Sequence, residues 1–131
     1  MINFFSKNKI IFLSINLFLI ILYIFPVSLM GCVFVGDCRI QPQITPNFII
    51  SSNHFYAFLI VSLIGFFTFK NSKKKIYIFI YLIALSIILE IFHLIIPGRS
   101  YQWSDLFGNF FGVIVVILIN NFIHKYENFK K

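Results

Sequence analysis

Four side chains that could bind or protonate a ligand fall within one short segment of a very apolar chain. The segment LEIFHLIIPGRSYQWSD, residues 89–105, contains Glu90, His93, Arg99 and Asp105. A carboxylate or an imidazole can act as a general base, and a guanidinium can bind a phosphate through paired hydrogen bonds. Because such groups are scarce elsewhere in the chain, their clustering is the main indication of a functional site.

The composition is that of an integral membrane protein. Of the 131 residues, 60% are hydrophobic and 11% are charged, and the mean hydropathy is +0.93. Soluble domains are about 45–50% apolar and about 25% charged, so this chain lacks the polar residues that would cover a soluble core. Its length suits one compact membrane bundle, and we expect a single domain over residues 1–131.

Four apolar stretches predict an all-α bundle of four transmembrane helices. They cover residues 10–30, 54–69, 76–96 and 106–123. Each is near the ~17–25 residues that a helix needs to cross a hydrocarbon core. Turn-forming sequences separate them, namely Pro26, Pro42, Pro46, KNSKKK and PGRS.

Basic residues predict the orientation of this bundle. Lysines precede the first stretch, lie in the turn between the second and third stretches, and follow the fourth stretch. The other two loops hold one basic residue each, Arg39 and Arg99. By the positive-inside rule both termini are cytoplasmic and these two loops face outward. The net charge of +7 is then a topology signal, and we expect no nucleic-acid partner. The lysines are Lys7, Lys9, Lys70, Lys73, Lys74, Lys75, Lys125, Lys130 and Lys131.

The only two cysteines, Cys32 and Cys38, follow the first apolar stretch. In an oxidising compartment they can close a small disulfide ring, which would contribute about 2–4 kcal/mol to ordering the loop. Alternatively, the stretch is a signal peptide, and LMGC at 29–32 is an imperfect lipobox that would leave Cys32 lipidated. The apolar run exceeds the ~7–15 residues of a signal core, which favours an uncleaved helix. Two cysteines make a poor zinc site, and we predict no metal site.

The third apolar stretch carries a polar stripe. Glu90 and His93 share one helix face, and Ser86 lies one turn below them. At ~1.5 Å per residue, Glu90 lies about 21 Å from the cytoplasmic boundary of a ~30 Å core, in its outer third.

The second and fourth apolar stretches also carry polar residues near their outer ends, at about the same membrane depth as Glu90. Asp105 and Asn109 share a face at the start of the fourth stretch, and His54 opens the second. Gly108 and Gly112 form a GxxxG motif, which predicts close helix packing within the bundle or in a homo-oligomer.

Structural and functional interpretations of these residues compete. Asp105 is a candidate N-cap of the fourth helix, and Arg99 could pair with it or with lipid phosphate. Ionisable groups inside a span are unfavourable by roughly 2.5–3.5 kcal/mol and usually mark a functional site, so we favour a functional cluster over helix packing alone. The candidate ligand-binding residues are His54, Glu90, His93, Arg99, Asp105 and Asn109.

The order of these motifs resembles the VanZ-like family. The family pattern is E-x-x-Q, a PGR turn, and D-x-x-x-N-x-x-G, and this chain reads EIFH, PGR and DLFGNFFG in the same order. The likeness covers about residues 54–123 and includes the His-Phe pair at 54–55 that opens a helix in the family. This chain departs from the pattern at His93, where the family has glutamine, and at 50–51, where Ile-Ser replaces Asp-Lys.

The resemblance implies a small multi-pass protein of the bacterial cytoplasmic membrane, with a role in the cell envelope. The founding member of the family is associated with teicoplanin resistance, so the resemblance implies a link to glycopeptide resistance. An outward site with Arg99 suits the anionic head group of a membrane lipid or of a lipid-linked envelope precursor. We expect Arg99 to bind phosphate while Glu90 and Asp105 orient it, and the histidines and Asn109 to hydrogen-bond the ligand.

Three classes of function stay open. A protein that binds or modifies the outer-leaflet surface without being an enzyme is preferred, because no nucleophile motif, glycine-rich phosphate loop or HExxH occurs, and no cofactor is expected. An intramembrane transferase or hydrolase using the Glu, His and Asp cluster as general base is the alternative. A small transporter or structural subunit comes third, since four spans without a repeat would have to oligomerise to form a pathway.

Overall fold

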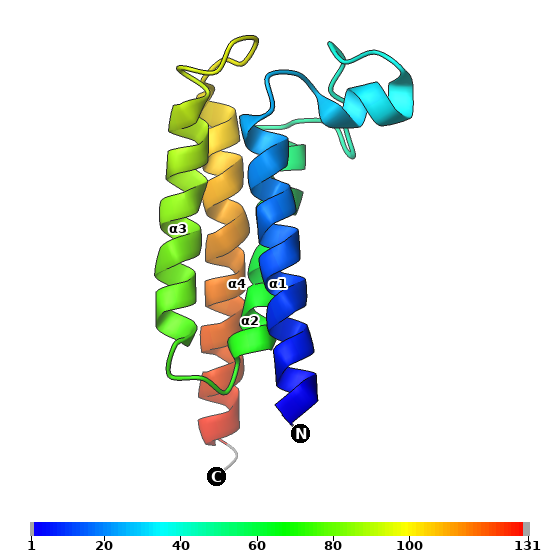
Figure 1. Ribbon diagram of the computed structural model, residues 1–131. Helices are drawn as coiled ribbons and strands as arrows, with labels where there is room; N and C mark the ends of the chain where they lie inside the picture. Colours follow the sequence, from blue (N-terminus) through cyan, green and yellow to red (C-terminus); the bar gives the residue numbers. More distant parts are fainter. Residues whose placement is uncertain (1, 130–131) are drawn as a thin grey trace.

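The computed structural model describes the backbone of residues 2–129 and the side chains of residues 8–129. Four long helices lie side by side, α1 (Ile2–Ile24), α2 (Ser52–Phe69), α3 (Lys75–Phe92) and α4 (Trp103–Phe129), with one π-helical turn, η1 (Gly31–Val35), between α1 and α2 (Figure 1). Within the described range no strand is formed. Three lysines used to predict the orientation lie outside this description: the side chain of Lys7, and Lys130 and Lys131.

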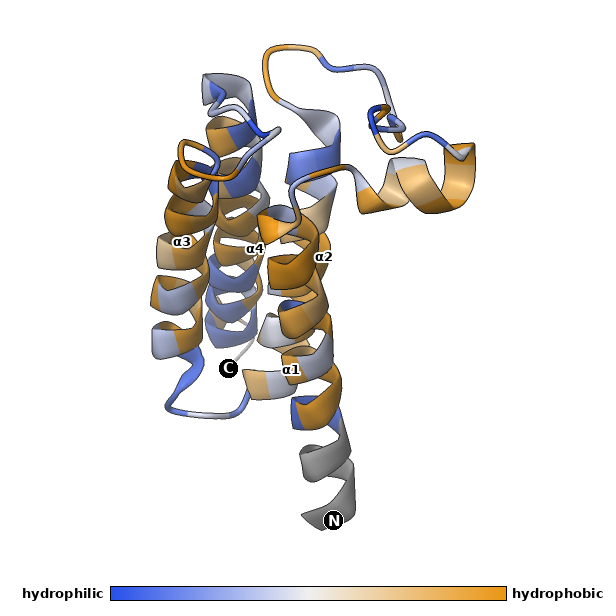
Figure 2. Ribbon diagram, turned by 45° about the horizontal axis from the view of Figure 1, so that its top comes forward, coloured by the Kyte–Doolittle hydropathy of each residue, from blue (hydrophilic) through white to orange (hydrophobic). Residues whose placement is uncertain are grey.

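Three of the helices are long and apolar enough to cross a membrane. They are α2, α3 and α4, whereas the part of α1 whose side chains are described, Asn8–Ile24, is an apolar helix of shorter length. At about 1.5 Å per residue, α2 and α3 each measure about 27 Å, close to a ~30 Å hydrocarbon core. Apolar residues make up much of α3, and hydrophilic ones gather in the turn between α2 and α3 and in parts of α4 (Figure 2). The prediction of an all-helical protein with membrane-length helices is confirmed at this level.

The core is built from the apolar faces that the helices turn toward one another. Phe58 of α2, Leu82 of α3 and Val113 of α4 are fully buried in one cluster, which Phe12 and Leu19 of α1 complete. Large apolar side chains also cover the outside of the bundle, where many are well exposed. A lipid environment accounts for helices that are hydrophobic on both faces.

Two helices end earlier than the hydrophobic pattern predicted. The first stretch was expected to continue to Met30, but α1 ends at Ile24 because Pro26 disfavours helical backbone at the preceding residue. The third was expected to reach Ile96, but α3 ends at Phe92 and residues 93–96 form tighter turns with bonds such as Leu94 N–H to the Ile91 carbonyl.

The fourth helix begins earlier than expected. It starts at Trp103 and runs on to Phe129. Asp105 therefore lies in the first turn, and its own backbone N–H already donates to the Gln102 carbonyl. The prediction of Asp105 as N-cap is wrong for this reason, and its carboxylate is free to face α2.

The closest approach in the bundle is between α2 and α4, at two glycines. A Cβ at Gly112 would lie 2.6 Å from the Phe55 carbonyl oxygen and 2.9 Å from the Leu59 nitrogen. A Cβ at Gly108 would lie 2.7 Å from the carbonyl oxygen of Ser51. Both glycines face a neighbouring backbone, so the GxxxG motif serves packing inside this bundle.

The two ends of the bundle differ in composition. α1 begins and α4 ends at the same end as the lysine-rich turn of residues 70–75 (Figure 1). The opposite end carries the long loop between α1 and α2 and the shorter loop between α3 and α4 (Figure 1). The polar residues singled out from the sequence all belong to this second end.

Candidate functional site

The candidate residues converge where α2, α3 and α4 reach the loop end of the bundle. His54 comes from the first turn of α2, Glu90 from the last turn of α3, and Asp105 and Asn109 from the first two turns of α4. His93 is the first residue after α3. Glu90 and Asn109 have no exposed surface, and His93 and His54 are buried, so the polar stripe faces the interior of the bundle.

The Glu90 carboxylate is held on one side only. Its Oε1 accepts a hydrogen bond of 3.0 Å from the backbone N–H of Gln102, and it lies 3.3 Å from Nδ1 of His93. Its Oε2 is buried and has no hydrogen-bond partner among the described residues. Burying a carboxylate oxygen without a hydrogen-bond partner is costly, which sets this atom apart from the other oxygen of Glu90.

The two ring nitrogens of His93 fix the position of a proton. Nε2 lies 3.1 Å from the carbonyl oxygen of Tyr23. Because a carbonyl oxygen only accepts, Nε2 carries the hydrogen. Nδ1 lies 3.3 Å from Oε1 of Glu90, so the imidazole connects Glu90 of α3 with the end of α1.

His54 bridges a hydroxyl and a carboxylate. Its Nδ1 lies 2.8 Å from the Ser51 hydroxyl, and its Nε2 lies 3.7 Å from Oδ2 of Asp105. Ser51 is buried and immediately precedes α2, where it stands at the N-cap position. Sequence reasoning did not select Ser51, whose hydroxyl meets the His54 ring and makes no capping bond to the helix backbone.

Asn109 and Tyr23 form the deepest part of the polar network. The Tyr23 hydroxyl donates to Oδ1 of Asn109, and Nδ2 of Asn109 donates to the Ser86 carbonyl at 3.3 Å. The Tyr23 ring also meets the edge of His54 and stacks on His93, with ring centroids 5.2 Å and 5.8 Å apart. Tyr23 was missed from the sequence, because one tyrosine near the end of an apolar stretch looks like an ordinary interfacial residue.

Arg99 interacts with backbone carbonyls, which corrects the predicted pairing with carboxylates. Its guanidinium donates to the carbonyl oxygens of Phe25, Leu22 and Val27 at 3.0–3.1 Å. Among the described residues it forms no ion pair, so Glu90 and Asp105 do not orient it as expected. The carbonyls at the end of α1 lack helical partners, and an arginine there satisfies them.

Arg99 nevertheless contributes positive charge to the site. Burial lowers the pKa of Arg99, whereas the neighbouring Tyr23, Glu90 and Asp105 raise it. An arginine remains cationic throughout the physiological pH range. The loop end of the bundle therefore holds a fixed positive charge above the buried carboxylates.

A cavity of about 390 Å³ opens above the polar cluster. Arg39 and Arg99 line it together with His54, His93 and Asp105. A smaller cavity of about 90 Å³ adjoins it and shares His54, His93 and Arg99 with it. The smaller cavity lies between α1 and α2, and its remaining walls are largely apolar, including Leu19, Leu22, Leu29, Met30 and Ala57.

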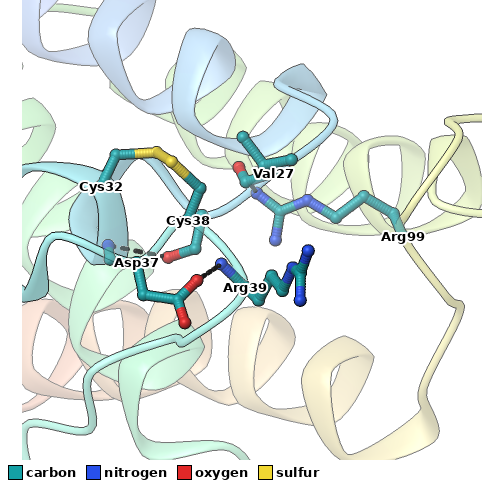
Figure 3. The surroundings of a disulfide bond; sticks show 8 residues. Val27, Cys32, Asp37, Cys38, Arg39 and Arg99 are labelled. Carbon is teal, nitrogen blue, oxygen red and sulfur yellow. Dashed lines mark hydrogen bonds between the residues drawn. A yellow bond between two sulfur atoms is a disulfide. The ribbon is translucent and has the colours of Figure 1, made fainter.

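A disulfide closes the loop that carries Arg39. Cys32 and Cys38 are bonded, so the Cys32 sulfur is not free for lipidation in this form (Figure 3). The Cys38 carbonyl accepts from the backbone N–H of Ser28 at 3.0 Å, which ties the ring to the end of α1. Arg39 and Arg99 extend to the same side of this loop (Figure 3) and line the same cavity. The disulfide thus helps to hold Arg39 at the cavity.

The groups gathered here allow two kinds of chemistry. Two guanidinium groups at the cavity suit an anion, and the buried imidazoles and carboxylates beneath can exchange protons. The smaller apolar cavity beside them suits part of an acyl chain. A scan of family models, a search of curated proteins and a search of solved structures each gave no match for this chain.

Proposed function

We propose that this chain is a VanZ-like membrane protein of the bacterial cell envelope that binds the phosphate-bearing head group of a membrane lipid or of a lipid-linked cell-wall precursor. In this proposal α1 joins α2, α3 and α4 as a fourth span, both termini are cytoplasmic, and the cavity opens outward. The lysines at residues 70–75 and Lys125 support this orientation, because basic residues stay on the cytoplasmic side.

The observation that carries the proposal is the polar cavity with two arginines beside an apolar one. Lipids are amphiphiles, so a binding site needs a charged pocket for the head group that adjoins an apolar groove for the acyl chain. The cavity lined by Arg39 and Arg99 and the adjoining one lined by Leu19 and Leu22 meet at His54 and His93. A head group in the larger cavity would leave its acyl chain between α1 and α2.

The two arginines have different roles in this proposal. Arg99 is largely occupied by carbonyls at the end of α1, so it supplies charge and a rigid wall. The Arg39 side chain is exposed and has no hydrogen-bond or ion-pair partner among the described residues. Arg39 therefore offers its guanidinium to a phosphate, while His54 and His93 form the floor.

The association of the VanZ-like founder with teicoplanin resistance gives this binding a possible consequence. Teicoplanin carries a lipid tail, so a protein that binds or reorganises outer-leaflet lipids would change access of the drug to the membrane surface. This link rests on the motifs at residues 90–112.

An enzyme acting on the same head group is the second candidate. Nδ1 of His93 lies 3.3 Å from Oε1 of Glu90, and His54 and Asp105 line the cavity above them. These groups are placed to take a proton from a water or hydroxyl held in the cavity. Catalysis would release a changed lipid, whereas binding would not.

The proposal is tested by measuring which lipids the purified chain retains. Native mass spectrometry in mixed micelles would compare phosphatidylglycerol with phosphatidylcholine for the unmodified chain, Arg39→Gln and the control Lys73→Gln at the opposite end. Losing one charged hydrogen bond of about 1.5 kcal/mol should lower the preference for the anionic lipid about 10-fold in Arg39→Gln and leave the control unchanged.

The other outcomes separate the alternatives. Equal retention of both lipids by the unmodified chain would contradict head-group binding. Displacement of the lipid by inorganic phosphate at low concentration would assign the cavity to free phosphate. A new lipid mass that forms with the unmodified chain and not with Glu90→Gln would favour the enzyme.

A further inference from the structure

Three metal-binding side chains from three different helices meet beneath the cavity. His54 of α2, Glu90 of α3 and Asp105 of α4 each place one ligand atom within 4.8 Å of the other two. Imidazole nitrogen and carboxylate oxygen are ligands that Zn²⁺ accepts, and three protein ligands with an open position are typical of its reactive sites. The sequence did not predict this, because no spacing motif links residues on separate helices.

The unpartnered oxygen of Glu90 is an independent sign of a missing cation. Oε2 of this fully buried side chain has no hydrogen-bond partner among the described residues. His93 lies against the other carboxylate oxygen, Oε1. Arg99 is also near in the chain, but three of its N–H groups donate to the carbonyls of Phe25, Leu22 and Val27, and its Nη1 donates to Gln41 at 3.4 Å. A positive ion beside Oε2 would compensate the buried charge.

Neighbouring groups hydrogen-bond the ring of His54 and the carboxylate of Glu90 at the atom that would not contact the metal, as is usual for metal ligands. Ser51 lies 2.8 Å from Nδ1 of His54 and can accept its N–H, which leaves the lone pair of Nε2 facing Asp105. The Gln102 N–H and His93 fix Oε1 of Glu90, which leaves Oε2 for a ligand. Hydrogen bonds to the second atom of each ligand orient it and tune its affinity.

From this arrangement we infer that His54, Glu90 and Asp105 form a site for a divalent transition-metal ion of the Zn²⁺ type, with its open position toward the cavity. Two carboxylates balance the charge of the ion, so that Arg39, Arg99 and the His93 ring face a neutral centre. With bonds of about 2.0–2.1 Å, tetrahedral ligands lie about 3.3 Å apart. The ligand atoms now lie within 4.8 Å of one another. To reach the tetrahedral spacing, each of them would move by about 1 Å through side-chain rotation.

The inference shares His54 and the larger cavity with the proposed function, but the two are tested separately. The metal site is tested without phospholipid, and lipid binding is tested at Arg39, which is not one of the proposed metal ligands. If the chain bound no zinc, the lipid retention that depends on Arg39 could still be observed. If the chain retained no anionic lipid, zinc binding could still be observed.

The test is a titration of the full-length chain, disulfide intact, stripped of metal and held in a metal-free detergent. Zn²⁺ alone would be titrated against a chromophoric chelator for the unmodified chain, His54→Asn, Glu90→Gln and Asp105→Asn. We expect one Zn²⁺ per chain, and a dissociation constant raised more than about 100-fold in each variant, since even outer-shell changes weaken metal sites 10–100-fold. Ser51→Ala should fall in that 10–100-fold range.

Matched controls come from the other end of α4, where His124→Asn and Glu127→Gln remove the same ligand types and should change nothing. Because a buried variant could misfold, X-ray absorption of the zinc-loaded unmodified chain gives a second measurement. An imidazole with oxygen neighbours at about 2.0–2.2 Å supports the site. Absence of one-to-one binding, unchanged affinity in the cluster variants, or a zinc shell without imidazole overturns it.

Discussion

At the scale of single residues, the polar groups of the bundle are organised around Tyr23 and Asn109. Asn109 is fully buried and uses both ends of its amide, accepting from the Tyr23 hydroxyl and donating to the Ser86 carbonyl. One side chain thereby connects α1, α3 and α4. In an apolar interior such bonds specify which faces meet, because the groups have no water to replace a lost partner.

The Tyr23–Asn109 bond gives the first residue-scale prediction. Asn109→Ala should lower the free energy of unfolding by about 1–3 kcal/mol, because it leaves the Tyr23 hydroxyl buried without its acceptor. Tyr23→Phe removes the same bond from the other side. The loss of stability in the double variant should therefore be smaller than the sum of the losses in the two single variants. Equilibrium unfolding in detergent measures all four proteins of the cycle.

The control for this cycle lies on the same helix. Asn120 is buried near the opposite end, where it accepts a bond from Lys75. It is about 16 Å from Asn109 along α4, so Asn120→Ala and Tyr23→Phe should be additive. If the unfolding free-energy changes of Tyr23→Phe and Asn109→Ala were also additive, the two residues would not form a coupled network.

Residue types were predicted well from the sequence, and their partners were not. Glu90, His93 and Asn109 were selected because ionisable and amide groups are rare inside apolar helices, and all three are buried. The bonds of Arg99 were not predictable, because its carbonyl acceptors become available only once Pro26 has ended α1. Ser51 and Tyr23 lacked any signal that distinguishes a partner from an ordinary neighbour.

At the scale of helices, the contact between α2 and α4 sets the depth at which the site residues meet. Gly108 and Gly112 let the two backbones approach where His54 and Asp105 face each other. A larger residue at either glycine would separate the helix ends that carry these ligands. The packing motif and the candidate site are therefore parts of the same interface.

Two glycines offer a matched test of this packing. Gly112→Ala should destabilise the bundle by about 1–3 kcal/mol, because the new Cβ meets the Phe55 and Leu59 backbone, which cannot move without shifting α2. Gly65→Ala meets only side chains of Phe12, Ile78 and Leu82, so its effect should be smaller. Thermal unfolding measures both. If Gly112→Ala kept its stability but no longer formed an oligomer, the GxxxG motif would instead be assigned to self-association.

Helix existence followed from the hydrophobic pattern, whereas helix ends depended on local chemistry. The apolar runs located all four helices, since hydrophobic residues in a membrane continue on every face. The runs extended past Ile24 and Phe92 because the following residues remain apolar although they are not helical. Proline after α1 and the PGR turn after α3 were the better guides to where the chain leaves the bundle.

At the scale of the whole molecule, the lysines and the cavity lie at opposite ends. The lysines of residues 70–75 and Lys125 lie at one end, and the cavity with Arg39, Arg99 and the disulfide at the other. A disulfide persists in an oxidising compartment and lysine-rich turns favour the cytoplasmic side, so both features support the proposed orientation. Each was visible in the sequence, but only the fold brings Arg39 and Arg99 to one cavity.

This agreement leads to a topology prediction. Green fluorescent protein fused to either end should fluoresce. Alkaline phosphatase inserted after Arg39 or Gly98 should be active, and an insertion after Asn71 should be inactive, because the proposed orientation places the lysine-rich turn of residues 70–75 in the cytoplasm. Replacing Lys73, Lys74 and Lys75 with glutamine should weaken this bias and yield both orientations. An outward N-terminus with a cytoplasmic C-terminus would mean that α1 does not span, and the cavity between α1 and α2 would then lose the wall that makes it suitable for a lipid.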